Sequence, residues 1–447
     1  MPISVSTIRP KAAGGAPEPS DDPAGPPETT AKPIVPGSAV AKALAAVWAG
    51  APITVVDAPP GSGKTAGVVS LVAQLTQHAG LRVLIEVVTR NQGVALAHRL
   101  VEQIPARHVE MAIKDIAPGT LPAGLYAGKR TGKIEPPRVT VKTVASCAFH
   151  APEGYDVIVV DEAYQATYAD ISLGASGAPQ IVCVGDPGQI GPVITIDTSI
   201  WQYMDDAPHR PAPEVLVGLD GTKHLSLDKT YRLGPVSAAA IAPLYNFPFS
   251  SACVERRLLG AGDANRDRRY GEVEAIEVPA VTSPDDIAML RAVVDRVAEL
   301  MATRLYWPAP DGAGQEGTKR TATSDIAVVL SRNSQVSVVK GLLAGRELDG
   351  VTVSTADRIQ GAEFPIVVAL DPAAGAPDPS DHAMANGRLC VMASRHTTHL
   401  SWVHDANWRE ALAGRSVTAV RGRAVREALV ANKTTNHTTD KDDRHVA

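Results

Sequence analysis

The chain has 447 residues, of which 45% are hydrophobic, 20% are charged and only 4% are aromatic. This is the composition of a globular protein, long enough for two or three domains whose cores must be built from Ala, Val, Leu and Ile. The formal net charge of −5 excludes a uniformly basic surface, so any binding of nucleic acid must come from local contacts.

The cysteines and the N-terminus define the expected cellular setting. The four cysteines, Cys147, Cys183, Cys253 and Cys390, form no CxxC pair. We therefore expect neither a zinc site nor a disulfide framework, which fits a reducing cytoplasm. No apolar run approaches the roughly 20 residues of a membrane span, and the N-terminus lacks the apolar segment of a signal peptide. We expect a cytoplasmic protein without a membrane partner.

The first expected elements are a tail and a helix. Residues 1–36 are rich in Pro, Gly, Ala and Ser, which predicts a disordered tail through which other proteins could be contacted. A helix is expected over Ala39–Trp48.

Short apolar, β-branched runs then alternate with helical stretches. Continuous runs of this kind suit strands that are buried on both faces of a parallel sheet. In the first half the runs are Ile53–Asp57, Val83–Val88, Val139–Val144, Val157–Val160 and Ile181–Val184. In the second half they are Ile326–Leu330, Val351–Ser354, Ile366–Leu370 and Leu389–Met392. The predicted fold class is therefore α/β, with two tandem units and mostly parallel sheets.

Segments rich in Pro and Gly indicate where the boundary between the two units lies. A Pro-rich stretch at Asp205–Pro213 and a turn at Gly218–Gly221 place the boundary near residue 220. We expect a first unit over 37–220, a second over 221–412, and a C-terminal helix with a polar tail over 413–447. A flexible loop is expected over Gly312–Ser324.

The strongest local motif is Ala58-Pro-Pro-Gly-Ser-Gly-Lys-Thr65, which follows a predicted strand and precedes a predicted helix, as a P-loop requires. Backbone N–H groups of such a loop wrap phosphates, and the helix N-terminus adds positive potential. Lys64 would reach the β- and γ-phosphates, and Thr65 would hold Mg²⁺. The residues predicted to cradle ATP are Pro60, Gly61, Ser62, Gly63, Lys64 and Thr65.

A second motif, Asp161-Glu162-Ala-Tyr-Gln165, follows an apolar strand. Adjacent carboxylates at the C-terminal end of a strand lie where open α/β sheets bind ligands. Asp161 suits coordination of Mg²⁺, and Glu162 suits deprotonation of an attacking water. A strand end with two solvated acids is the alternative, and the preceding P-loop makes it much weaker.

Further motifs follow in a fixed order. Gly185-Asp-Pro-Gly-Gln189 comes after a strand, Tyr231-Arg-Leu-Gly-Pro235 opens the second half, and Thr355 to Glu363 contains Gln360-Gly-Ala-Glu. Ser394-Arg395 ends the series. This ordered set resembles the superfamily 1 helicases, and the wording DEAYQ is similar to the 5′-to-3′ branch that includes the nonsense-mediated-decay helicase.

The resemblance implies two RecA-like P-loop domains with ATP and Mg²⁺ between them. By the matching positions, Gln189 senses the γ-phosphate, Arg232 and Arg395 act as arginine fingers, and Tyr231 stacks on adenine. Gln360, Gly361 and Glu363 would line the nucleotide site. An arginine finger can contribute ~10³–10⁵ in rate, so charge supplied from a second domain would make hydrolysis depend on closure.

Contacts to a nucleic acid strand are predicted from short polar side chains after strands. Thr89, Asn91, Thr143, Ser146 and Thr355 resemble family positions that touch the sugar–phosphate backbone. Helix capping explains such residues equally well. Basic runs at Lys129–Lys133 and at Arg266, Arg268 and Arg269 could border a strand channel, although solvated loops are the commoner meaning of such runs.

Together these features predict nucleic-acid-stimulated ATP hydrolysis that drives movement along a single strand, with DNA favoured over RNA, and duplex unwinding. The alternatives are a translocase that displaces proteins without unwinding, and a nucleotide-gated binding module. No Gln occurs between Ser38 and Gly50, where the family often has an adenine-reading glutamine, so a strict preference for ATP does not follow.

Overall fold

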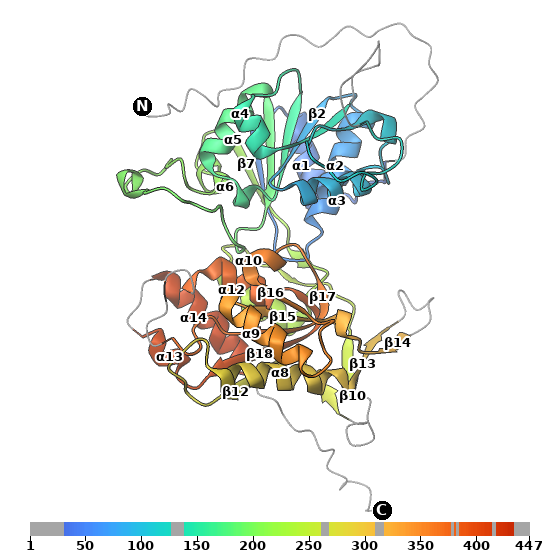
Figure 1. The fold of residues 1–447 in the computed structure, drawn as a ribbon. Helices are drawn as coiled ribbons and strands as arrows, with labels where there is room; N and C mark the ends of the chain where they lie inside the picture. Colours follow the sequence, from blue (N-terminus) through green and yellow to red (C-terminus); the bar gives the residue numbers. More distant parts are fainter. Residues whose placement is uncertain are drawn as a thin grey trace, which may run out of the picture. The chain divides into compact units, whose positions relative to one another are not determined.

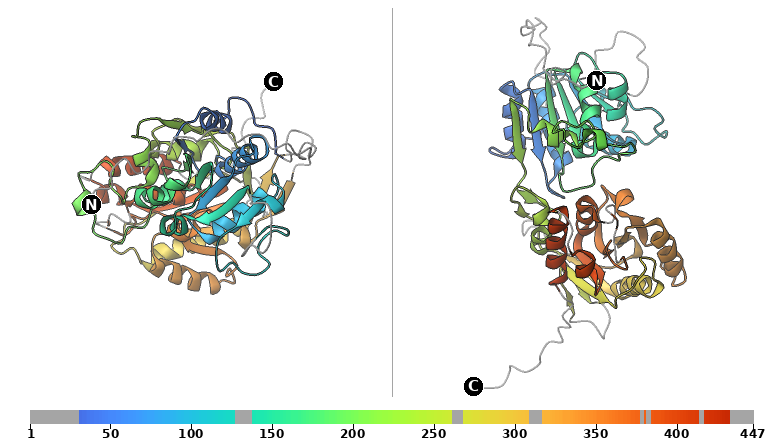
Figure 2. Two further views of the ribbon diagram at one scale, coloured as in Figure 1. Left: turned by 90° about the horizontal axis from the view of Figure 1, so that it is seen from above. Right: turned by 90° about the vertical axis from the view of Figure 1, so that its left-hand side faces the viewer.

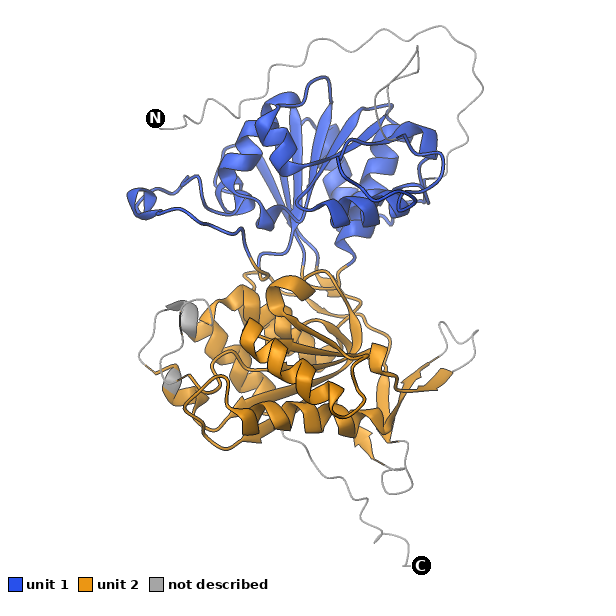
Figure 3. Ribbon diagram, viewed as in Figure 1, with its two compact units in different colours: residues 1–58, 63–187, 191–227 blue, residues 59–62, 188–190, 228–447 orange. Residues whose placement is uncertain are grey.

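The computed structural model describes residues 31–126, 138–260, 268–308, 317–376, 380, 384–413 and 417–432. The chain divides into two compact units (Figure 3). The first contains residues 1–58, 63–187 and 191–227, and the second contains residues 59–62, 188–190 and 228–447.

The first unit is built on a seven-stranded sheet in which every pair of neighbouring strands is parallel (Figure 1). Its strand order is β3-β4-β2-β5-β6-β1-β7. The strands are β1 (Ile53–Asp57), β2 (Val83–Val87), β3 (Val109–Met111), β4 (Val139–Thr143), β5 (Val157–Asp161), β6 (Gln180–Gly185) and β7 (Thr222–Ser226). The central strands are buried along their whole length, as continuous Val and Ile runs predict.

Helices cover both faces of this sheet (Figure 2). One face packs against α1 (Ala39–Trp48), α2 (Lys64–Gln77) and α3 (Arg90–Leu100). The other packs against α4 (Val144–Phe149), α5 (Tyr168–Gly174) and α6 (Ala212–Leu216). The result is a three-layered α/β unit in which the loops after β1, β5 and β6 emerge at the same edge of the sheet, because the strands are parallel.

The second unit contains a five-stranded parallel sheet of order β12-β18-β17-β15-β16. Its strands are β12 (Val273–Val278), β15 (Ile326–Leu330), β16 (Thr352–Thr355), β17 (Phe364–Leu370) and β18 (His396–Asp405). One face packs against α8 (Ile287–Met301) and α9 (Asn333–Ala344). The other packs against α7 (Pro235–Ile241), α12 (Asn386–Ala393) and α14 (Val417–Val430). The short helices α10 (Ala356–Ile359) and α13 (Trp408–Ala411) complete the main layers.

Two smaller sheets belong to the second unit. One is a pair, β8 (Lys229–Thr230) with β9 (Ser250–Ser251). The other is a four-stranded antiparallel sheet of order β11-β10-β13-β14. Its strands are β10 (Arg257–Gly260), β11 (Arg269–Tyr270), β13 (Thr303–Trp307) and β14 (Gly317–Arg320). The predicted fold class, two α/β units of the RecA-like type with mostly parallel main sheets, is confirmed.

One predicted strand is wrong. Leu389–Met392 lies within helix α12, where every residue from Arg388 to Ala393 is buried. A short apolar run that is buried on all sides has the same sequence pattern in a helix and in a strand. The strand of this region is β18, whose many His, Thr and Ser residues obscured its apolar pattern.

Three boundaries differ from the expected ones. Strand β7 pairs with β1, so the first unit continues to Leu227 rather than ending at 220. Residues 317–320 form β14 inside the stretch predicted to be a loop; part of that stretch, 312–316, lies outside the described residues. The expected tail also ends earlier than residue 36, because Ala31 and Ile34 pack against the core of the first unit. Residues 1–30 lie outside the described part.

No helix within the described residues is long and apolar enough to cross a membrane.

Candidate active site

The P-loop lies where it was predicted, between β1 and α2 of the first unit. Gly61 and Gly63 have φ of 70° and 81°, a left-handed conformation that side chains with a Cβ rarely adopt. Gly63 is the N-cap of α2 and has no side chain to cap the helix, which leaves the N-terminal N–H groups to an anion. The backbone of the loop therefore has the form of a phosphate cradle.

Lys64 is buried to 9% exposure and lies between two carboxylates. Its Nζ is 3.8 Å from Oε1 of Glu162 and 3.7 Å from Oδ2 of Asp186. The structure thus brings together the lysine of the P-loop, the second acid of DEAYQ and the aspartate of GDPGQ. Asp186 was not among the predicted site residues, although it lies within a motif that the sequence displays.

At the end of β5, Asp161 is buried, and the partly exposed Glu162 beside it has an unusual backbone conformation. Glu162 has φ of 55°, which is unusual for a residue with a side chain and characteristic of functional sites. Its backbone N–H donates to Oδ1 of Asp161 at 3.1 Å. Burial, followed by the neighbouring charge of Glu162, raises the pKa of Asp161 to about 7. The positive charge of Lys64 acts in the opposite direction and favours the carboxylate form of Asp161.

The donor set fits Mg²⁺. Asp161 offers a buried carboxylate and Thr65 a hydroxyl on the first turn of α2, both hard oxygen donors of the kind that Mg²⁺ uses together with phosphate oxygens and water. No cluster of three or more His, Cys, Asp or Glu suited to a metal ion occurs among the described residues. The two residues therefore suit a nucleotide-bound cation rather than an all-protein metal site.

A supporting network behind the site was not predicted. The hydroxyl of Tyr164 donates to Oδ1 of Asp57 at 2.7 Å, and Nε2 of His224 lies 2.7 Å from Oδ2 of the same carboxylate. Asp57 ends β1, Tyr164 belongs to DEAYQ, and His224 lies on β7. This network ties the end of β1 to the middle of β7 and to the turn after β5. A sequence signal existed for Tyr164 alone, as part of the motif.

The second unit gathers the two predicted arginine fingers. Nη1 of Arg232 donates to the carbonyl of Ser394 at 3.1 Å, and Nη2 forms an ion pair with Glu363. Nη2 of Arg395 donates to Oγ of Ser394 at 3.2 Å. Burial, followed by the charges of both arginines, lowers the pKa of His396 to about 3. His396 is therefore neutral at physiological pH and adds no positive charge beside Arg232 and Arg395.

The other residues predicted to bind the nucleotide, Gln189, Tyr231, Gln360 and Gly361, all belong to the second unit. Nε2 of Gln360 is 3.4 Å from Oε1 of Gln189. Gly361 has φ of 90°, so a glycine is required there. Tyr231 is 59% exposed, which leaves its ring open to a planar ligand. Its backbone N–H donates to the carbonyl of Gly61 at 2.9 Å.

The predicted strand contacts are explained in part by helix capping. Thr89 forms a capping box with Gln92 at the start of α3. Oγ1 of Thr143 accepts from the N–H of Ser146 at the start of α4, at 3.3 Å. Asn91 is exposed on the first turn of α3, and Thr355 is the buried N-cap of α10 without a side-chain cap bond. Capping thus occupies Thr89 and Thr143, and contact with a strand stays a prediction for all five residues.

The basic run 129–133 and Arg266 lie outside the described residues. Arg268 is held by an ion pair with Glu299 at 2.6 Å, and its guanidinium lies 4.3 Å from the ring centroid of Tyr270. It therefore has a structural role.

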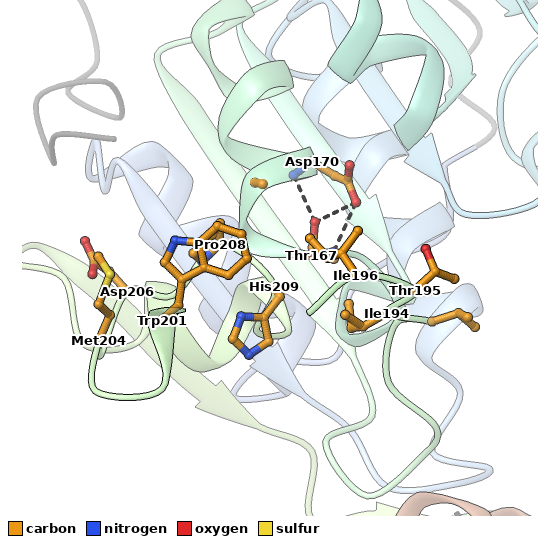
Figure 4. A pocket seen from close by; sticks show the side chains of 12 residues that line it. Thr167, Asp170, Ile194, Thr195, Ile196, Trp201, Met204, Asp206, Pro208 and His209 are labelled. Carbon is orange, nitrogen blue, oxygen red and sulfur yellow. Dashed lines mark hydrogen bonds between the residues drawn. The ribbon is translucent and has the colours of Figure 1, made fainter. Parts of the chain in front are cut away.

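A separate apolar cavity of about 450 Å³ lies in the first unit (Figure 4). It is formed by the start of α5 and by the segment 193–209, which follows GDPGQ. Trp201 and His209 stand beside each other there, with ring centroids 6.0 Å apart. The cavity contains none of the motif residues and no cation, so it does not suit the phosphates of a nucleotide. Its lining residues are Thr167, Ala169, Asp170, Val193, Ile194, Thr195, Ile196, Trp201, Met204, Asp206, Pro208 and His209.

Comparison with known proteins agrees with the site of the first unit. Residues 39–207 match a family model described as an AAA domain. The match includes the P-loop, DEAYQ and GDPGQ. The match thus agrees with the parallel-sheet fold of the first unit and with the order of these three motifs. No curated protein is detectably similar to the chain.

Among solved structures, the chain is similar to the arterivirus nonstructural protein 10 helicase, with 18% identity and a TM-score of 0.43, over 83% of this chain and 63% of that one. A PRRSV helicase is similar with 17% identity and a TM-score of 0.41, over 81% of this chain and 54% of that one. The chain spans less than two thirds of the length of either structure. Likeness at this level does not identify an activity.

Proposed function

We propose that this chain is an ATP-hydrolysing motor of the superfamily 1 helicase type, whose hydrolysis is stimulated by a nucleic acid strand. The observation that carries the proposal is the placement of Lys64 between Glu162 and Asp186, at strand ends of a P-loop domain. The P-loop, DEAYQ and GDPGQ are separated by many residues in the sequence. They nevertheless bring two carboxylates within 4 Å of the ammonium group of the P-loop lysine.

In the proposed reaction, Lys64 binds the β- and γ-phosphates when they displace its present carboxylate partners. Glu162 orients the attacking water and accepts its proton. Thr65 and Asp161 would hold Mg²⁺, which neutralises phosphate charge. Arg232 and Arg395 of the second unit would supply further positive charge in the transition state, so hydrolysis would depend on closure of the two units on the nucleotide.

We propose single-stranded DNA as the strand, in preference to RNA, with movement in the 5′-to-3′ direction and unwinding of duplexes. The support is the order and wording of the motifs, DEAYQ above all. Steady-state ATPase rates with single-stranded DNA, with single-stranded RNA and with neither test this directly. A several-fold stimulation by DNA is expected. An ATPase rate that responds to neither strand would contradict the motor and favour a nucleotide-gated binding module.

A strand-displacement assay on a tailed duplex tests the finer proposal. ATP-dependent release of the labelled strand from a 5′-tailed duplex supports unwinding in the 5′-to-3′ direction. ATPase stimulation together with displacement of a bound protein, but without strand release, would instead support a translocase that remodels nucleoprotein.

A further inference from the structure

The small antiparallel sheet of the second unit has two unlike faces. Leu258, Tyr270 and Leu305 are buried and belong to the core beneath α8. Side chains alternate along a strand, so the neighbouring residues of β10, β11 and β13 point away from that core. Most of these outward-pointing residues are arginines, although the net charge of the chain is negative.

The register places three arginines in one row across the outer face. Leu259 pairs with Arg269 on one side and with Arg304 on the other, and Arg304 pairs with Arg320. The row thus reads Arg269, Leu259, Arg304 and Arg320 across the four strands. At a strand spacing of about 4.8 Å, it spans about 14 Å.

A second row lies beside the first. Arg257 pairs with Tyr306, which pairs with Thr318. The guanidinium of Arg257 lies 5.9 Å from the ring centroid of Tyr306, which places both on the same face. The outer face therefore presents four arginines and one aromatic ring, and we call it the arginine face (Arg257, Arg269, Arg304, Tyr306 and Arg320).

Little acidic charge balances this face. Glu255 pairs with Arg257 at 2.8 Å. Arg269, Arg304 and Arg320 take part in no ion pair within the described part of the chain. Arg304 and Arg320 face each other directly across β13 and β14, and like charges in that position destabilise a sheet. Among the described residues no carboxylate pairs with these two arginines, so an external anion would stabilise the arrangement.

A cavity of about 550 Å³ continues the face beyond β10 and β11. Arg256, Arg257 and Arg269 line it, together with the two carboxylates of Glu255 and Glu272. Glu255 is the partner of Arg257, and Glu272 accepts from the backbone N–H groups of Val236 and Ser237. The row of Arg269, Arg304 and Arg320 is longer than one phosphate group, so a polyanion fits it better than a single small anion.

We propose that the arginine face binds the sugar–phosphate backbone of a single-stranded nucleic acid, as a contact separate from the motif residues. Planar guanidinium groups suit phosphates, and Tyr306 beside them suits stacking on an unpaired base. The aromatic ring favours a single strand over a duplex, whose bases are already stacked. The proposal takes its partner class from the proposed function, but it concerns binding and not hydrolysis.

The test uses the full chain and a labelled oligodeoxythymidine, without nucleotide, titrated at several salt concentrations. The variant R304Q/R320Q removes two charges from the face, and R291Q/R423Q removes two exposed charges elsewhere in the same unit. Each lost phosphate contact lowers the slope of log K against log salt by about 0.7 for a single strand. We expect the slope of R304Q/R320Q to fall by about 1.4, with several-fold weaker binding at low salt, while the control keeps the wild-type slope.

Equal affinity and slope in R304Q/R320Q and in the control would overturn the proposal. Y306L tests the choice of a single strand: about ten-fold weaker binding is expected from the loss of one stacked base. A duplex or polyglutamate that competes as strongly as the oligonucleotide would overturn that choice. Basal ATPase without a strand should be unchanged in all these variants. Binding that persists while no strand stimulates ATPase would refute the proposed motor and leave the arginine face intact.

Discussion

Lys64 is held against Asp186, with Nζ 3.7 Å from the carboxylate, at the point where a bound nucleotide would place its phosphates. Glu162 lies on the same ammonium group at 3.8 Å. Two carboxylates thus share the ammonium group of Lys64. Phosphate oxygens would take their place, because they carry more negative charge and are also bound by the loop N–H groups.

Replacement of Lys64 by Ala should abolish ATP hydrolysis and weaken nucleotide binding, since it removes the charge on the β- and γ-phosphates and leaves two acids facing them. Steady-state ATPase and equilibrium titration with a fluorescent nucleotide measure both effects. Lys42→Ala, at an exposed position of α1, is the matched control and should be unchanged. Wild-type hydrolysis in a folded Lys64 variant would rule out the P-loop assignment.

Replacement of Glu162 by Gln should preserve binding of Mg²⁺-ATP and slow turnover by at least about 10²-fold, because an amide cannot accept the proton of the attacking water. The change also removes the neighbouring charge that raises the pKa of Asp161, so Asp161 should ionise more readily and remain a ligand for the cation. Single-turnover hydrolysis and nucleotide affinity separate the two effects. A turnover rate within a few-fold of wild type would show that another group is the base.

Buried Glu86 on β2 should make stability depend on pH. Burial raises its pKa to about 7, against an ordinary value of 4.5. Between these values the folded protein keeps a proton that the unfolded chain has released, so stability falls as pH rises toward 7. The full effect is at most about 3 kcal/mol.

Glu86→Gln should therefore gain stability relative to wild type as pH rises from 5 to 8. Urea unfolding at four pH values gives the difference between the two proteins. Asp161 titrates in the same window but is present in both, so its contribution cancels. A constant difference across this pH range would mean that Glu86 titrates normally.

The N-terminal boundary can be tested by two truncations. Removal of residues 1–30 should leave the Tm unchanged. Removal of residues 1–36 also takes away the packing of Ile34 and the bond from the N–H of Ala31 to Gln77, at 3.2 Å. A loss of about 1 kcal/mol would lower the Tm of the first unit by about 2–4 °C. Identical melting curves for the two truncations would mean that residues 31–36 add nothing to stability.

Most of the fold follows from sequence because the strands of a parallel sheet carry their own pattern. Ile53–Asp57 and Ile326–Leu330 have the predicted bounds, since continuous β-branched runs next to glycines and polar turns leave few alternatives. Leu389–Met392 fails because complete burial removes the periodicity that separates a helix from a strand. His396–Asp405 was missed because its buried His and Ser side chains are paired inside the protein, for example His399 with Ser401.

Prediction of the site from sequence was likewise limited to residues within local motifs. Lys64, Asp161 and Glu162 could be placed from local motifs alone. Asp186 lies in the GDPGQ motif, but its contact with Lys64 depends on β6 lying beside β1. The contact of His224 with Asp57 depends likewise on β7 lying on the other side of β1. The capping roles of Thr89 and Thr143 were foreseen as an alternative and are now observed.

The sharpest prediction concerns Arg232 and Arg395. Arg232 is engaged by Ser394 and Glu363, and Arg395 is only 1% exposed. If they are arginine fingers, replacement of either by Ala should leave ATP affinity almost unchanged and reduce hydrolysis by ~10³-fold or more, because a finger acts on the transition state. A strand should still bind each variant but no longer stimulate its ATPase.

A purely structural role predicts a different result. Loss of a buried arginine would then lower stability by several kcal/mol, and activity would fall only as far as the protein unfolds. Arg426→Ala is the matched control, since Arg426 is fully buried and pairs with Asp371 at 2.9 Å, outside every motif. It should lower the Tm and keep strand-stimulated turnover below the melting range. If Arg232→Ala and Arg395→Ala behave like this control, with stimulation retained, the second unit has no part in hydrolysis and the motor proposal fails.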